Sequence, residues 1–143
     1  MDARIRTFAE PDTEAVVALW ETCELTRPWN DPRADIARKA TVQPELFLVA
    51  EPHASGGIIG SVMAGYDGHR GWLYSLATDP AHRGQGIARA LVAEAERRLE
   101  AMGCPKVQLM VRVGNDRVHG LYDALGYGTD DVLVRSRRLI ADS

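Results

Sequence analysis

A basic, glycine-rich hexapeptide in the middle of the chain has residue types that predict binding chemistry. It follows an apolar run that ends at Asp79 and Pro80, and it opens a long amphipathic stretch. The first N–H groups of a helix have no partner inside the helix, and the helix dipole places partial positive charge there. Small residues let a ligand approach the backbone closely. The turn therefore predicts a site for a diphosphate. The residues expected to hold it are Arg83, Gly84, Gln85, Gly86, Ile87 and Ala88.

Two other phosphate-binding motifs fit this turn poorly. A dinucleotide-binding Rossmann turn needs a third glycine, and Arg89 stands near that position. A P-loop needs a Gly-Lys-Ser or Gly-Lys-Thr sequence, and the chain contains neither. The remaining alternative is an ordinary glycine-rich helix start with no ligand.

The same turn carries a family resemblance. Arg83, Gly86 and Ala88 match the defined positions of the acyl-CoA-binding motif, Arg/Gln-x-x-Gly-x-Gly/Ala, of the GNAT superfamily of N-acetyltransferases. Residues 115–127, which read NDRVHGLYDALGY, resemble the next motif of that superfamily. Residues 27–32 and 65–71 further resemble its small bacterial YpeA-type subgroup. The resemblance covers nearly the whole chain, and the two motifs together are much more specific than either alone.

The resemblance implies a fold and an activity. The expected fold is a single α/β domain over residues 1–143. Its mixed sheet has six to seven strands, with a splay between the fourth and fifth, and four helices flank it. The expected reaction moves the acetyl group of acetyl-CoA, a co-substrate, to a primary amine of an unidentified small-molecule or peptide acceptor, by direct attack in a ternary complex. The alternative is a non-catalytic acetyl-CoA-binding sensor module. Family members often dimerise, so a homodimer stays open.

Hydrophobic periodicity predicts the elements independently of the resemblance. Four amphipathic stretches predict helices, with Asp12 and Asp31 as N-caps of the first two and Asn115 or Asp116 as the cap of the last. The run from residue 46 to 51 is continuously apolar, which is typical of a central strand. The expected strands are residues 3–8, 46–51, 58–66, 72–78, 106–113 and 132–140, with a turn at 53–57, and the expected helices are 11–25, 32–42, 86–102 and 115–126.

The resemblance also assigns roles around the acyl end of the cofactor. Backbone groups of Leu76, Ala77 and Thr78 would pair with the acyl-pantetheine arm like an added strand and polarise the thioester carbonyl. Tyr122 would donate a hydrogen bond or a proton to the leaving sulfur, and Asn115 would contact the cofactor. The alternatives from the residues alone are a core strand, a core tyrosine on an apolar helical stripe, and a simple N-cap.

The general base is not fixed by the sequence. Many relatives carry a glutamate on the strand before the glycine-rich turn, but residues 72–78 contain no carboxylate and Tyr74 stands near the expected place. His69, whose unperturbed pKa of about 6.5 suits a base, is one candidate. Asp67, or a water chain that ends on Glu24 or Asp31, is another. An exposed turn histidine is the alternative for His69.

The resemblance implies that the acceptor enters beside the loop between the first two helices. The residues proposed to line its pocket are Arg27, Trp29, Asn30, Asp31, Tyr66 and Asp67. Their mixture of acidic and basic side chains favours a polar acceptor that carries an amine. A local packing anchor is the alternative for Trp29.

Composition restricts the remaining function classes. A chain of 143 residues with 45% hydrophobic content suits one globular domain, and a net charge of -3 gives no support for nucleic-acid or membrane binding. Two cysteines, without a signal sequence or a membrane-spanning run, favour a reducing cytoplasm. No metal is expected, because the four histidines lack ligand-like spacing.

Overall fold

One mixed β-sheet forms the centre of the protein. The computed structural model describes residues 3–53 and 57–142, so the predicted turn at 53–57 lies partly outside the described residues. The sheet has the order β1-β2-β3-β4-β5. The first four strands pair antiparallel, whereas β5 runs parallel to β4. The strands are β1 (Ala3–Thr7), β2 (Phe47–Pro52), β3 (Gly60–Tyr66), β4 (Gly71–Thr78) and β5 (Val107–Leu109).

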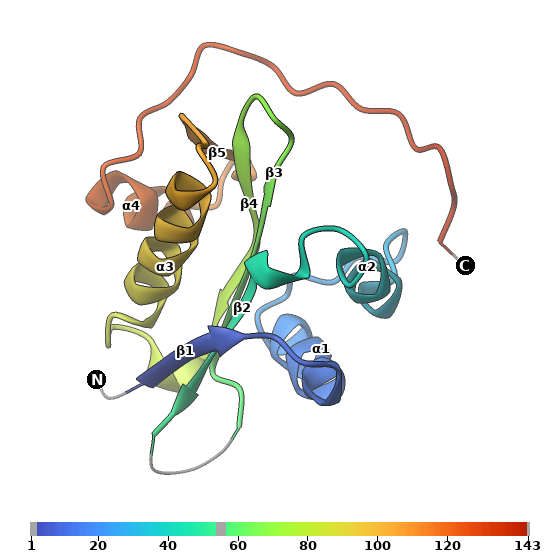
Figure 1. Cartoon of the computed structure of the whole chain (residues 1–143), viewed down its shortest axis with the longest axis vertical. Helices are drawn as coiled ribbons and strands as arrows, with labels where there is room; N and C mark the ends of the chain where they lie inside the picture. Colours follow the sequence, from blue (N-terminus) through green and yellow to red (C-terminus); the bar gives the residue numbers. More distant parts are fainter. Residues whose placement is uncertain (1–2, 54–56, 143) are drawn as a thin grey trace.

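Helices cover both faces of this sheet. α3 and α4 lie on one side, and α1 and α2 lie on the other (Figure 1). Asp31 caps α2 as predicted, because its side chain accepts a hydrogen bond from the N–H of Arg33 at 2.9 Å. Asp12 holds the N-cap position of α1 but makes no capping hydrogen bond, since its carboxylate pairs with Arg6. The helices are α1 (Thr13–Thr22), α2 (Pro32–Lys39), α3 (Ile87–Ala101) and α4 (Asp116–Ala124), and short 3₁₀ turns are η1 (Glu10–Asp12), η2 (Pro44–Leu46) and η3 (Pro80–His82).

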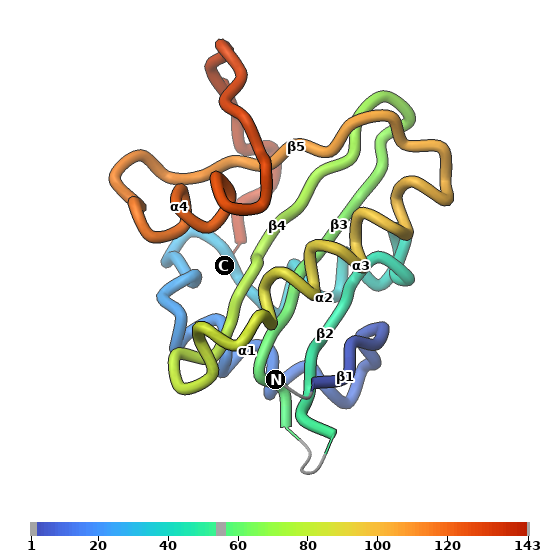
Figure 2. The backbone as a smooth tube through the Cα atoms, turned by 90° about the vertical axis from the view of Figure 1, so that its left-hand side faces the viewer, coloured from blue at the N-terminus to red at the C-terminus, as the bar shows by residue number. Residues whose placement is uncertain are grey.

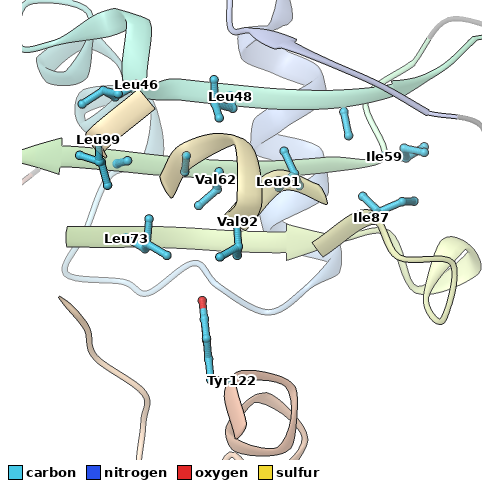
Figure 3. Packing of buried hydrophobic residues seen from close by; sticks show 13 residues of the cluster. Leu46, Leu48, Ile59, Val62, Leu73, Ile87, Leu91, Val92, Leu99 and Tyr122 are labelled. Carbon is cyan, nitrogen blue, oxygen red and sulfur yellow. The ribbon is translucent and has the colours of Figure 1, made fainter. Parts of the chain in front are cut away.

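The apolar run of β2 explains the position of that strand. Leu48 and Ala50 belong to the hydrophobic cluster under α3, whereas Phe47 and Val49 belong to the cluster under α1 and α2. Successive side chains of a strand point to opposite faces, so a strand covered on both faces is apolar throughout. The prediction of a central strand is confirmed. Figure 3 shows the α3 side of this core.

A close approach between α3 and β3 fixes the start of that helix. A Cβ on Gly60 would lie 2.8 Å from Cγ2 of Ile87 and 2.9 Å from Cδ1 of Leu91. Both side chains are buried in the cluster under α3. The absence of a side chain at Gly60 therefore lets the first turns of α3 rest on the sheet, which holds the glycine-rich turn at the end of β4.

The predicted closing strand at residues 132–140 is wrong, so the sheet has five strands and not six to seven. After α4 the chain passes over the top of the molecule toward α2 (Figure 1). Polar contacts hold its end there: Asp142 accepts from the N–H of Asp31 at 2.8 Å and pairs with Arg38, and Arg138 donates to Asn30 at 2.8 Å. β5 itself is only Val107–Leu109, shorter than predicted, and offers little edge for a further strand.

Candidate functional site

The divergence of β4 from β5 opens a large hollow. The parallel pairing ends at Leu73 and Leu109, although β4 continues to Thr78. In Figure 2 the two strands lie side by side only at one end, and α4 lies beside the opening between them. A cleft of about 1790 Å³ occupies this region. The splay predicted between the fourth and fifth strands is therefore present.

The cleft joins sequence segments that lie far apart. Its walls come from β4, the start of α3, the segment after β5, α4, and the region between α1 and α2. Of the predicted site residues, the structure brings the following into its lining: Arg27, Trp29, Asn30, Leu76, Ala77, Thr78, Arg83, Gly84, Gly86, Ile87, Ala88, Asn115 and Tyr122.

The glycine-rich turn gives the cleft a group of backbone donors that suits an anion. Gly84 and Gly86 have φ angles of 79° and 82°, in the left-handed region that disfavours other residues. Gly86 occupies the N-cap position of α3, and no side chain caps this end. Within the described residues we find no acceptor for the N–H groups of Gly84, Gln85 and Gly86. These donors, with the positive end of the helix dipole, suit a diphosphate.

His82 adds an unpaired polar atom beside this turn. Its Nδ1 is buried and has no hydrogen-bond partner within the described residues, and the side chain lines the cleft. A buried polar atom without a partner costs free energy. An incoming polar ligand would supply that partner, so this atom fits a ligand-binding cleft better than an apolar core.

Tyr122 reaches the cleft from α4. Its side chain is 7% exposed, and its hydroxyl points toward β4 (Figure 3). Its ring packs edge to face on Tyr127 with 5.3 Å between centroids. Burial raises the pKa of the Tyr122 phenol to about 12, because the low-dielectric surroundings disfavour the phenolate. At neutral pH the side chain is therefore a protonated hydrogen-bond donor.

The β4 wall contains a bulge at Ser75. The β3–β4 register shifts between Ser61 and Met63, and Ser75 has a φ of +53°. A residue added to one strand disrupts the ladder locally and leaves backbone groups unpaired. The bulge lies directly before Leu76 and Ala77, whose backbone the family resemblance predicts to contact the thioester.

Asn115 occupies the N-cap position of α4 but makes no side-chain capping hydrogen bond. A capping asparagine normally accepts from a backbone N–H of the first helical turn. Because that bond is absent and the residue lines the cleft, its amide is available to a ligand. Its contact with the cofactor stays a prediction.

The loop between α1 and α2 adds polar groups to the cleft. Arg27, Trp29 and Asn30 line it, and the Arg27 guanidinium donates to the carbonyls of Glu24 and Thr26 at 2.8 Å each. Trp29 is 56% exposed, so it does not belong to the core. Lys39 also lines the cleft, and its ammonium donates to the carbonyl of Ala64 at 2.5 Å. Burial lowers the pKa of Lys39.

The remaining predicted residues do not line the cleft. Gln85 is exposed in the turn, and Asp31 is occupied in capping α2. Tyr66 ends β3, Asp67 and His69 lie in the turn between β3 and β4, and all three are outside the cleft lining. Their roles stay predictions.

Asp67 has a structural role in that hairpin. Its carboxylate accepts from the N–H groups of Arg70 at 2.7 Å and His69 at 2.8 Å, and from Trp72 Nε1 at 3.3 Å. The backbone donors of Arg70 and His69 lower the pKa of Asp67. A carboxylate held in this way stabilises the turn and stays ionised near neutral pH.

Other candidate sites are poorer. Within residues 3–53 and 57–142, no group of three or more His, Cys, Asp or Glu side chains could hold a metal ion. A smaller hollow of about 420 Å³ lies between η1, α2 and Phe47, away from the glycine-rich turn. In the same part of the chain, no helix is both long and apolar enough to span a bilayer.

Sequence reasoning missed Ser75 and Lys39. The two leucines at 73 and 76 are three residues apart, a spacing that breaks the alternation of a regular strand and could have indicated the bulge. Nothing in the local sequence indicates that Lys39 faces a cleft. His82 adjoins Arg83 of the predicted diphosphate turn in the sequence, and the structure places its side chain in the cleft lining.

Comparison with known proteins agrees with this geometry. Residues 13–127 match the sequence profile of the Acetyltransferase (GNAT) family. The chain is 54% identical over 138 residues to an acetyltransferase of Yersinia enterocolitica and 55% identical to one of Pectobacterium atrosepticum, and each match covers 96% of both chains.

Solved structures share the fold. Ard1 from Thermoplasma volcanium has a TM-score of 0.78 at 25% identity, covering 88% of this chain and 82% of that one. AAC(6')-Iy, solved with a bisubstrate analogue containing CoA, has a TM-score of 0.74 at 19% identity, covering 98% and 100%. From the profile match and the two bacterial relatives, we conclude that this chain belongs to the GNAT family of acetyltransferases.

Proposed function

We propose that the protein transfers the acetyl group of acetyl-CoA to a primary amine by direct attack within a ternary complex. The single observation that carries this proposal is one continuous cleft. It is lined by backbone N–H groups that have no acceptor, by a bulged strand, by a buried tyrosine hydroxyl and by polar side chains. Acetyl-CoA supplies an activated thioester. The chain supplies binding groups at one end and access for an amine at the other.

At the cofactor end, the N–H groups around Gly84 and Gly86 would hold the diphosphate. Backbone donors beside the β4 bulge, at Leu76 and Ala77, would hydrogen-bond the thioester oxygen. Such a donor is worth about 3–4 kcal/mol when it is aimed at developing negative charge. Binding in this manner resembles the addition of a strand to an exposed sheet edge.

The chemical step needs a neutral amine and a leaving sulfur. The amine nitrogen forms a bond to the carbonyl carbon, the carbon–sulfur bond breaks with its electron pair on sulfur, and the amine loses one proton. Tyr122 would donate a hydrogen bond to the departing sulfur. A phenol with a pKa of about 12 would transfer its proton uphill to a thiolate with a pKa of about 8.5, so hydrogen bonding is the better-supported role.

Glu24 is the carboxylate that we propose as the final proton acceptor, through water. It lines the cleft beside the acceptor end, and it holds an unusual backbone conformation with a φ of 60°. Asp31, the other end point considered for a water chain, is committed to its helix cap and lies outside the lining. A residue in the left-handed region costs free energy, and such strain is often found at functional positions.

Replacing Glu24 by glutamine should lower kcat by about 10²-fold, the usual scale for a general base. The measurement is kcat of acetyl transfer for wild type, Glu24→Gln and His69→Ala. A drop in Glu24→Gln, with His69→Ala near wild type, supports Glu24. A drop of that size in His69→Ala, with Glu24→Gln near wild type, would transfer the role to His69.

The function itself is tested by incubating the protein with acetyl-CoA and a panel of amines while free thiol is measured. The panel should include peptides with free N-termini and aminoglycosides, because one fold relative was solved with a peptide and CoA and another with an acetylneamine bisubstrate analogue. Amine-dependent thiol release supports the proposal. Tight binding of acetyl-CoA without release across the panel would favour a sensor module.

Two free cysteines support a cytoplasmic location.

We also propose a homodimer that uses the C-terminal segment. Val132, Leu133 and Val134 are 69%, 91% and 64% exposed, which is unfavourable for three consecutive apolar residues. A second copy could cover these three side chains and remove them from water.

The expected result in solution is a particle of twice the mass of one chain by light scattering. Leu133→Asp should shift that particle toward the monomer, because the charge cannot be buried without a partner. Leu139→Asp, close to the polar anchor at Arg138, is the comparison variant. A wild-type monomer at every concentration tested would contradict the dimer.

A further inference from the structure

A chain of buried hydrogen bonds connects α1 with the bulge of β4. The indole Nε1 of Trp20 donates to Oγ of Ser61 at 2.9 Å, and the same Oγ donates to the backbone carbonyl of Ser75 at 3.2 Å. A serine hydroxyl has one proton and two lone pairs, so it can accept and donate at the same time. Its direction is fixed here, because the indole can only donate and the carbonyl can only accept.

The burial of this chain makes it unusual. Among the described residues, Ser61 is the polar side chain that is completely buried, with 0% exposure, and Trp20 is 4% exposed. Both lie on the α1 side of the sheet, where the neighbours are apolar. A buried hydroxyl without partners is costly. An alanine at this position would be buried at a lower cost in free energy. The serine hydroxyl therefore indicates a specific role for its two hydrogen bonds.

The carbonyl that Ser61 holds belongs to the distorted residue of β4. Ser61 pairs with Ala77 and Met63 pairs with Tyr74, so Val62 alone faces both Ser75 and Leu76. Ser75 is the extra residue, with a φ of +53° that a serine adopts reluctantly. A hydrogen bond to its carbonyl from the neighbouring strand stabilises this conformation.

The bulge decides which way the next residues face. Leu73 and Leu76 both pack toward α3, whereas Ala77 packs toward α1. In a regular strand Leu73 and Ala77 would share a face. Removing the bulge would shift the pairing by one residue and exchange the faces of Leu76 and Ala77.

A second contact from α1 fixes the other end of the same stretch. Cys23 Sγ donates to the carbonyl of Thr78 at 3.3 Å. α1 thus holds Ser75 through Trp20 and Ser61, and holds Thr78 through Cys23. Leu76 and Ala77 lie between these two points, and both line the cleft.

We propose that Trp20 and Ser61 are positioning residues for acetyl transfer, which act by holding the Ser75 bulge so that the backbone of Leu76 and Ala77 meets the thioester. This role rests on the proposed function. It adds two residues that support acetyl transfer without touching the substrate. α1 therefore does more than cover the sheet, since it sets the geometry of the acyl end.

The test compares Ser61→Ala with Val92→Ala, a control at a buried residue away from these two strands. Val92 lies on α3, is 2% exposed, belongs to the cluster under α3, and does not line the cleft. Ser61→Ala should lower kcat/KM by about tenfold or more, because small misalignments of reacting groups have effects of this size. Affinity for CoA, which lacks the acetyl group, should change little. Val92→Ala should reduce thermal stability and leave kcat/KM near wild type.

Two further measurements separate positioning from stability. Amide NMR shifts of Leu76 and Ala77 should move in Ser61→Ala and not in Val92→Ala. Adding Ser75→Gly to Ser61→Ala should restore both the shifts and kcat/KM, because glycine adopts a positive φ without the hydrogen bond. If Ser61→Ala does not fold, Trp20→Phe removes the first donor while keeping an aromatic ring, and it should show the same changes to a smaller degree.

Equal kcat/KM in the two alanine variants, unmoved amide shifts, or a double variant that fails to recover would each overturn the proposal. The NMR measurement needs no acetyl transfer. A wild-type protein that releases no thiol would therefore refute the proposed function, while the shifts would still decide whether Ser61 holds the bulge.

Discussion

Replacing Tyr122 by phenylalanine is expected to lower kcat by about 10²-fold or more, with acetyl-CoA affinity and thermal stability close to wild type. The change removes one hydroxyl that points toward β4 and lines the cleft, and it keeps the ring that packs on Tyr127. Within the described residues that hydroxyl makes no hydrogen bond, so its removal leaves no protein group unpaired. The loss should therefore appear in turnover and not in folding.

Tyr127→Phe is the matched control for this measurement. Its hydroxyl donates to Glu96 at 2.5 Å, and it does not line the cleft. Steady-state thiol release should give wild-type kcat for Tyr127→Phe, with some loss of stability. An unchanged kcat in Tyr122→Phe would remove Tyr122 from the mechanism.

The pH dependence of Tyr122 has a definite sign. Burial raises its pKa to about 12 in the folded protein, compared with about 10 for an unperturbed phenol. Its contribution to stability is fully present below pH ~10 and is lost as pH rises toward the folded value. Activity should therefore show no loss from phenol ionisation between neutrality and pH ~10.

Replacing Gly86 by valine is expected to weaken acetyl-CoA binding by about 10²-fold or more. A non-glycine residue at its φ of 82° costs about 1–2 kcal/mol. Relaxation of that strain would turn the N–H groups of this turn away from the diphosphate. Two lost charge-assisted hydrogen bonds, at about 1.5–3 kcal/mol each, account for a change of this size.

Gly103→Val provides the control for Gly86→Val. Gly103 ends the same helix, has a φ of 88°, and, like Gly86, has no atom within 4 Å of an added Cβ. Calorimetry should show similar losses of stability in the two variants but wild-type affinity in Gly103→Val. Equal affinities in both variants would remove the glycine-rich turn from cofactor binding.

The sequence by itself determined the parts of this protein that depend on local chemistry. The uncapped glycine-rich helix start, the Asp31 cap and the fully apolar β2 follow from backbone geometry and the periodicity of burial, which act over a few residues. The two family motifs also identified the acetyltransferase family, because each motif is a short stretch of residues that can be recognised without knowledge of the fold.

Only the tertiary structure decided which distant segments meet. The path of residues 128–142 depends on polar contacts of Arg138 and Asp142 with the α1–α2 region, which strand propensity cannot reveal. The bulge at Ser75 depends on a hydroxyl of β3 and an indole of α1, which lie far from it in sequence. Such contacts follow from three-dimensional packing, so the shape of the acyl end and the residues that fix it became visible only in the folded chain.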